Sequence, residues 1–75
     1  MEIIFSRHAR RQLKWRKITR EEVLEIIAKP EFETVLLPDK VILLGFAGGR
    51  YLKVVIRKEN ERMVVITATV KKRKG

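Results

Sequence analysis

The chain has 75 residues, which suffices for one domain with a compact core, because a chain this short buries only about 60% of its unfolded surface. It carries 18 Lys and Arg against 9 Asp and Glu, a net charge of +9, and it has no cysteine. Disulfides, thiolate chemistry and cysteine-based zinc sites are thereby excluded. No apolar run approaches the roughly 20 residues that span a bilayer. We expect a single domain over residues 1–75, in the cytoplasm, without signal peptide or membrane segment.

Basic residues are concentrated toward the two ends of the chain. Residues 1–17 hold six basic residues and one acidic residue, and residues 50–75 hold nine basic and two acidic residues. Residues 18–49 instead carry a net charge of −3. This excess of positive charge suits a polyanionic partner, with an ordinary solvated surface as the alternative interpretation. The scarcity of Asn, Gln and Ser among so many charged residues is typical of thermophile proteins.

The first helix is predicted over residues 7–17. Ile3 to Phe5 is a short apolar run, interpreted as a brief strand or staple, and Ser6 after it is a suitable N-cap. At helical spacing Ala9 and Leu13 share one face, and the basic side chains cover the opposite face. The buried stripe of this helix is therefore expected to be narrow.

A second helix follows after a link of about two residues. Thr19 and Glu22 have the spacing of a capping box, and Pro30 ends the helix. The short link predicts that the two helices form an antiparallel hairpin. The residues expected on the buried face are Val23, Leu24, Ile26 and Ile27.

After Pro30 the pattern changes to that of strands. The predicted strands cover residues 33–37, 41–47, 50–58 and 62–71. Gly48-Gly49 predicts a hairpin turn, and residues 71–75 form a basic, frayed tail. Residues 41–47 are apolar on both faces, which indicates a strand that is covered on both sides or faces a partner.

The predicted fold class is α+β, with a two-helix hairpin packed on one face of a three- to four-stranded antiparallel sheet. Residues of alternate strand positions share a face. The face expected beneath the helices carries Leu52, Val54, Ile56, Val64 and Ile66. The opposite, half-open face carries Tyr51, Lys53, Arg57, Thr67, Thr69 and Lys71, which suits RNA or phosphate as well as an ordinary solvated sheet face.

A spaced pattern runs through both helices and returns in the last strand. It consists of Ser6-Arg7-His8-Ala9, Leu13, Arg16, Ile18-Thr19, Glu22-Val23 and Val65-Ile66-Thr67. The pattern resembles a family of small bacterial and archaeal domains, catalogued as a domain of unknown function, that open with a Ser-x-His-Ala helix followed by Arg-x-Ile-Thr-x-x-Glu-Val. The order of helix hairpin and antiparallel sheet is also similar to the RelE/ParE toxin superfamily.

The RelE/ParE resemblance implies a small, basic, cytoplasmic toxin that an antitoxin neutralises. Many such proteins cleave messenger RNA on the ribosome, whereas the ParE branch poisons gyrase. RelE-type nucleases commonly place a Tyr or His in the C-terminal segment, and residues 71–75 contain neither. A catalytic acid or base would have to come from elsewhere, or be lacking, and the architecture alone does not fix the function.

RNA cleavage by the 2′-OH needs a base, an acid and cations that stabilise the phosphorane. The candidates are Tyr51 for proton transfer or stacking, Lys53 for positioning the backbone and Arg57 for charge stabilisation. His8 is a further candidate base, although a structural role at the helix start is the favoured interpretation. For Trp15, a core position is favoured over a stacking platform.

The remaining candidate residues would contact the backbone of a nucleic acid. They are Arg7, Arg10, Arg11, Lys14, Thr67, Lys71, Lys72, Arg73 and Lys74. One His, no Cys and scattered acids predict no metal site, and no cofactor motif is found.

Two functional hypotheses follow from the sequence. The leading one is a RelE/ParE-like toxin-type protein that binds RNA or the ribosome, with an acidic antitoxin as partner and with messenger RNA cleavage as a candidate activity. The alternative is a non-catalytic basic module that binds nucleic acid or an acidic protein.

Overall fold

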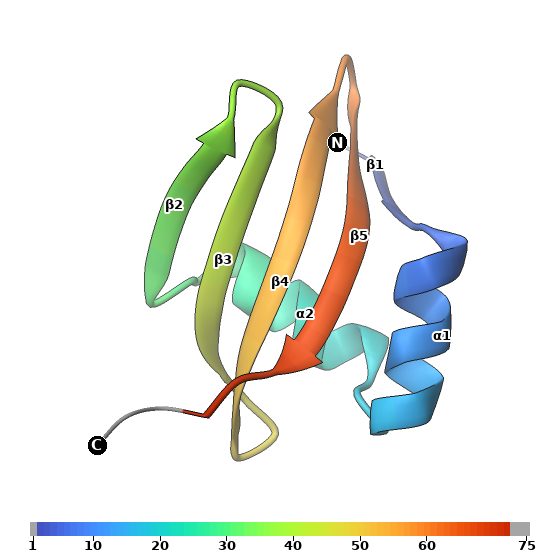
Figure 1. Cartoon of the computed structure of the whole chain (residues 1–75), viewed down its shortest axis with the longest axis vertical. Helices are drawn as coiled ribbons and strands as arrows, with labels where there is room; N and C mark the ends of the chain where they lie inside the picture. Colours follow the sequence, from blue (N-terminus) through green and yellow to red (C-terminus); the bar gives the residue numbers. More distant parts are fainter. Residues whose placement is uncertain (1, 73–75) are drawn as a thin grey trace.

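The computed structural model describes residues 2–72, which form five strands and two helices (Figure 1). Their order is β1 (Glu2–Phe5), α1 (Arg7–Arg16), α2 (Arg20–Ala28), β2 (Phe32–Leu37), β3 (Lys40–Ala47), β4 (Arg50–Glu59) and β5 (Arg62–Val70). The α+β class is confirmed, and the element boundaries lie within a residue or two of the expected ones. The predicted residues Arg73 and Lys74 lie outside the described range.

The sheet has five strands in the order β1-β5-β4-β3-β2, and it is mixed rather than purely antiparallel. Strands β2 to β5 form the expected antiparallel meander. Strand β1 adds to β5 in parallel, with Ile3 opposite Met63 and Phe5 opposite Val65. The prediction of three to four antiparallel strands missed this pairing, because a four-residue strand gives no local signal of a partner so far along the chain.

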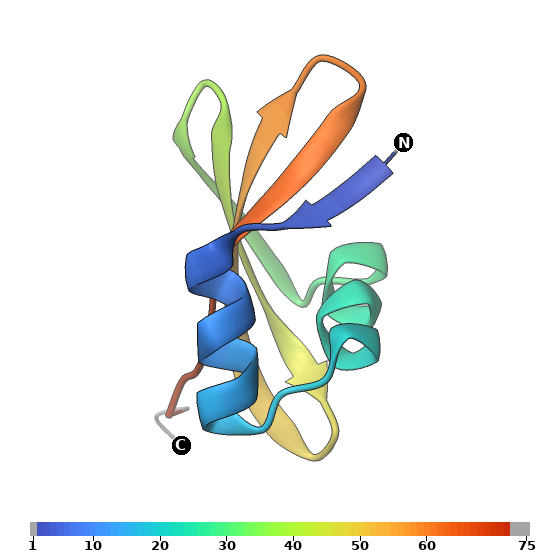
Figure 2. The same ribbon diagram turned by 90° about the vertical axis from the view of Figure 1, so that its right-hand side faces the viewer.

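Both helices lie on one side of the meander, but they contact different strands (Figures 1 and 2). Helix α1 runs along β5, whereas α2 crosses behind β3 and β4. The short link reverses the chain direction as expected (Figure 2), but the two helices pack on the sheet more than on each other. Lys17 adopts a left-handed conformation with φ of 55°, and Ile18 is buried directly after it. This turn redirects the chain from one helix to the other.

Both helices begin at the residues that the sequence indicates. Ser6 Oγ accepts a hydrogen bond from the Ala9 N–H at 3.0 Å. Thr19 Oγ1 accepts one from the Glu22 N–H at 3.1 Å, and Glu22 Oε1 accepts one from the Thr19 N–H at 2.8 Å. The capping box is thus complete, and each helix start satisfies N–H groups that have no partner within the helix.

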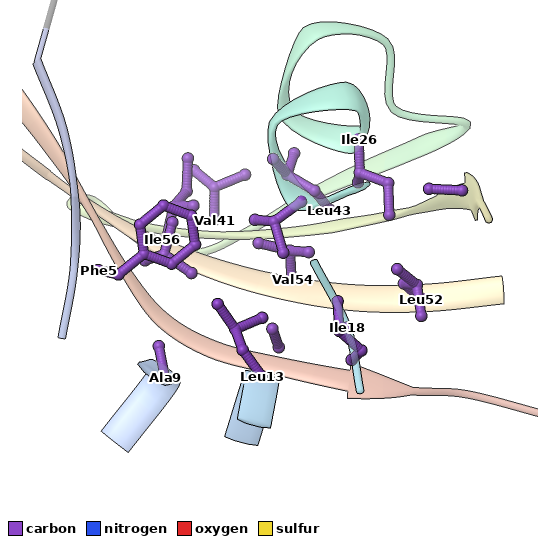
Figure 3. Packing of buried hydrophobic residues seen from close by; sticks show 14 residues of the cluster. Phe5, Ala9, Leu13, Ile18, Ile26, Val41, Leu43, Leu52, Val54 and Ile56 are labelled. Carbon is purple, nitrogen blue, oxygen red and sulfur yellow. The ribbon is translucent and has the colours of Figure 1, made fainter. Parts of the chain in front are cut away.

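The core lies between the sheet and the helices (Figure 3). The sheet contributes buried side chains of β3 and β4, and α1 contributes the expected narrow stripe of Ala9 and Leu13. Helix α2 buries Val23 and Ile26, while Leu24, which was expected in the core, is 36% exposed. None of the helices in the described part of the chain is long and apolar enough to cross a membrane.

A β-bulge changes which β5 residues face the core. Val55 pairs with Thr67, but the next residue, Ile56, pairs with Val65. Ile66 is therefore an extra residue that shifts the alternation along β5. As a result Val65 and Ala68 join the cluster beneath the helices. Of the residues expected there, Val64 is buried outside this cluster, opposite Arg57, and Ile66 is half-exposed.

Candidate functional site

Three of the four candidate catalytic residues lie on one face of β4. The strand register sets Tyr51 opposite Phe46, Lys53 opposite Leu44 and Arg57 opposite Lys40. Leu52, Val54 and Ile56, which alternate with them on β4, are buried in the core beneath the helices (Figure 3). The face of the sheet that carries the three candidates is thus turned away from both helices, and we call it the open face.

Neither Tyr51 nor Arg57 is presented freely on the open face. Tyr51 is only 9% exposed, and its ring packs on Phe46 with 4.8 Å between the centroids. Arg57 Nη2 lies 2.8 Å from Glu59 Oε2, and Arg62 Nε donates to the other Glu59 oxygen at 2.7 Å. The hydrogen bonds from Arg62 and then Arg57 hold the pKa of Glu59 below its ordinary value. The ionised Glu59 therefore competes with any phosphate for Arg57.

His8 lies on α1, on the helix side of the sheet, whereas the β4 candidates lie on the open face. The Ser6 N–H, two residues before His8, donates to the Val65 carbonyl, and Arg57 pairs with the neighbouring Val64. The Tyr51 carbonyl accepts from the Lys71 N–H, six residues or roughly 20 Å further along the chain. His8 is exposed on α1, and its side chain makes no hydrogen bond or ion pair with described residues. The expected structural hydrogen bond of His8 is not formed, and the four candidates do not form one catalytic cluster.

The solvent side of α1 is a strip of cations, which we call the α1 strip. Its members are Arg7, Arg10, Arg11, Lys14 and Lys17, and all of them are exposed. The helix contains no acidic residue. Among the described residues, every ion pair uses Glu22 or Glu59 as the anion, so none of them neutralises the α1 strip.

Trp15 lies at the border of the α1 strip and is 80% exposed. The predicted core position of Trp15 is therefore wrong. Gln12, three residues earlier and on the same side of α1, reaches the edge of β5, where its Oε1 accepts the Ala68 N–H at 2.9 Å. Trp15 is turned still further from the core, and the Arg16 guanidinium lies 5.4 Å from its ring centroid. An exposed indole beside cations is suited to stacking on a base.

The other candidate phosphate contacts lie around the end of β5. Thr67 is half-buried opposite Val55, and Lys71 and Lys72 are exposed directly after the strand. The Lys71 N–H donates to the Tyr51 carbonyl at 2.8 Å, which continues the pairing with β4 beyond the last strand residue.

The open face is more apolar than the predicted basic surface. Its large exposed or half-exposed apolar residues are Phe32, Ile42, Leu44, Phe46, Val55 and Ile66. The sequence did indicate this apolar surface. Residues 41–47 are apolar on both faces of the strand, and only one of these faces packs on α2. By contrast, a shallow hollow between β1 and the β4–β5 turn is lined mainly by acids: Glu2, Glu59, Asn60, Glu61 and Arg62.

The described residues contain no group of three or more His, Cys, Asp or Glu that could hold a metal ion. The chemistry available to the site therefore comes from cations, aromatic rings and apolar side chains. Such surfaces bind by charge and by stacking.

Fold and surface together define a small basic α+β domain with a cationic helix that no carboxylate of residues 2–72 neutralises. The chain belongs to the family described as a domain of unknown function, DUF4258, whose model matches residues 5–70. The resemblance inferred from the spaced pattern is thereby confirmed. No curated protein and no solved structure matches the chain significantly.

Proposed function

We propose that this protein binds RNA in the cytoplasm, through the α1 strip and the basic residues after β5. The observation that carries this proposal is the lack of any carboxylate paired with the α1 strip among the described residues. Unpaired arginines and lysines contact phosphates at little cost, because no existing ion pair has to be broken. Trp15, exposed beside these cations, supplies a stacking surface that every base can use.

Single-stranded RNA suits this surface better than a duplex. The α1 strip supplies phosphate contacts along one helix, and unpaired bases are free to stack on an indole. The similarity of the helix order and meander to RelE/ParE toxins supports messenger RNA or the ribosome as the source of that RNA. Growth and messenger RNA integrity after induced expression in a bacterial host test this toxin-type role.

Binding without cleavage is the form of the proposal that the site favours, because His8 and the β4 candidates lie on opposite sides of the sheet. RNA cleavage stays a second candidate function, since Tyr51, Lys53 and Arg57 share the open face. If cleavage occurs there, Arg57→Ala lowers its rate by about 10²-fold, the usual scale for the loss of one charge-stabilising group. An equal cleavage rate in wild type and variant excludes that site.

Salt-dependent binding to a fluorescent single-stranded RNA tests the proposal directly. Each phosphate contact contributes a slope of about −0.7 to log K against log salt. The double variant Arg10→Glu/Arg11→Glu is expected to flatten the slope by at least about 1.4, the share of two lost contacts. The matched control Lys29→Glu/Lys58→Glu makes the same charge change at exposed residues away from α1 and is expected to keep the wild-type slope.

Equal weakening by both double variants would show that only net charge matters, and would contradict a site on α1. If the wild type binds no RNA but retains an acidic polypeptide such as polyglutamate, the non-catalytic module for an acidic protein partner replaces this proposal.

A further inference from the structure

The two edges of the sheet differ in how much of their backbone is covered. At one edge, β1 pairs with the first half of β5, and α1 covers the second half (Figure 2). The Ser6 N–H bonds the Val65 carbonyl and Gln12 accepts the Ala68 N–H, so backbone groups of β5 are satisfied and only the four-residue β1 remains as a short edge strand. At the other edge β2 pairs with β3 alone, and its outer side is unpaired within the described residues.

Strand β2 is apolar to a degree that is unusual for a free edge. All six of its residues are exposed. Four of the eight large exposed hydrophobic residues in the described part of the chain belong to it: Phe32 (57%), Val35 (65%), Leu36 (56%) and Leu37 (48%). Proteins ordinarily protect a free edge with charged side chains, prolines or bulges. The only charged residue of β2 is Glu33, and its one register shift lies between Val35 and Leu37, so Phe32 to Val35 keep a regular pairing with β3. Its backbone and its side chains on both faces are thus available to a further strand.

We propose that β2 pairs antiparallel with β2 of a second copy of this chain, joining the two sheets into one. A twofold axis perpendicular to the sheet gives this pairing and keeps both sets of helices on the same side. An added strand must carry apolar side chains on both faces, and β2 itself meets that requirement.

Charge favours this edge over the rest of the surface for self-association. A chain with a net charge of +9 repels its copy wherever cations would meet. Residues 30–39 contain three acids and no Lys or Arg. The α1 strip lies beside β5, three strand spacings or about 14 Å from β2. Contact through β2 therefore leaves both α1 strips at the outer ends of the dimer.

The positions of Glu33 and Pro38 also select the register. With Thr34 on the axis, Glu33 faces Val35 of the second copy. An axis at Glu33 would set two carboxylates opposite each other, and an axis at Val35 would set Phe32 opposite the turn residue Pro38. Like charges directly opposite each other destabilise strand pairs. The register centred on Thr34 avoids both.

Variants that place a positive or a negative charge at Thr34, on the proposed axis, test the proposal on the intact chain. In sedimentation equilibrium the wild type is expected to approach twice the 8.8 kDa chain mass at high concentration. Thr34→Lys and Thr34→Glu each bring two like charges together and are expected to sediment at one chain mass. An equimolar mixture of the two is expected to recover the dimer mass, which an unfolded variant could not do. The control Val70→Lys, at an exposed residue on β5, keeps the wild-type mass.

Three results would overturn the proposal. A wild type that stays at one chain mass up to submillimolar concentration would contradict pairing with a second copy. A strand of another protein would then be the partner of β2. Undiminished association of Thr34→Lys would place the contact elsewhere. Failure of the equimolar mixture to associate would exclude the register centred on Thr34.

Discussion

Arg50 ties the end of α1 to the β3–β4 hairpin, and Arg50→Ala is expected to destabilise the protein. Its Nη1 donates to the Arg16 carbonyl at 3.0 Å, and its Nη2 donates to the Lys17 carbonyl at 2.8 Å. The same Nη2 lies 3.3 Å from Glu22 Oε1. One guanidinium thus satisfies carbonyls at the end of α1 and completes the capping network of α2. Because α1 carries the cationic strip, this contact also holds the proposed RNA surface against the sheet.

The size of the effect follows from the exposure of these groups. A sheltered hydrogen bond to a charged group contributes about 1.5–3 kcal/mol, and a fully exposed ion pair contributes about 0–1 kcal/mol. The Arg50 side chain is 33% exposed and that of Glu22 is 16% exposed, which is between the two cases. We expect Arg50→Ala to lower the free energy of unfolding by about 2 kcal/mol, and Tm by about 8–16 °C for a domain of this size.

Urea unfolding followed by circular dichroism measures this loss. Arg57→Ala is the matched control, because it also removes an arginine from an ion pair on β4, but a more exposed one. Arg50→Lys retains the charge without the two-pronged guanidinium and is expected to recover only part of the stability. Equal losses in Arg50→Ala and Arg57→Ala would refute the argument that the carbonyl contacts at the end of α1 matter.

Two further predictions concern the same corner of the fold. Gly48 and Gly49 both have positive φ, 61° and 77°, but a Cβ at Gly48 would overlap the Glu22 carboxylate, whereas one at Gly49 meets nothing. Gly48→Ala should therefore lower the urea midpoint more than Gly49→Ala, and equal midpoints would contradict this. The hydrogen bond from the Thr19 N–H, with help from Arg50, holds the pKa of Glu22 below its ordinary 4.5. The stability that ionised Glu22 contributes is thus complete above pH 4.5 and lost as the pH falls through its lowered pKa, so Glu22→Gln should flatten the acid side of a stability–pH profile.

Local signals in the sequence were sufficient to predict the helix starts and the meander. Ser6 and Thr19 are followed at fixed spacing by the N–H groups that they cap, so no distant contact is needed to recognise them. Gly48 and Gly49 supply the two positive φ angles that a tight hairpin requires. These features depend on neighbours within a few residues.

Features that depend on distant contacts could not be predicted in this way. The bulge at Ile66 is set by how β5 fits against β4 and β1, and the alternating pattern of β5 gives no indication of it. Trp15 was assigned to the core because large aromatic residues are generally buried. The core stripe of α1 ends at Gln12, which bonds the edge of β5, and this contact requires knowledge of the strand beside it.

The candidate site was predictable in its parts more than in its arrangement. Helical spacing alone placed the cations of α1 on one side, and strand alternation placed Tyr51, Lys53 and Arg57 on one face. The distance of His8 from that face depends on the packing of α1 along β5. The pair of Arg57 with Glu59 had a usable signal, since residues two apart on a strand point to the same side.

The parallel pairing of β1 with β5 ties the completion of the fold to the timing of translation. Ile3 has no partner until Met63 has been synthesised, and Gln12 has none until Ala68 has. At about 5–20 residues per second, the ribosome takes a few seconds to add the intervening chain. During that interval the apolar stripe of α1 is uncovered, while its cations emerge beside ribosomal RNA. The codons for β5 therefore decide when the nascent helix can dock, and a message truncated before them yields a chain in which β1 and α1 lack their main partner strand.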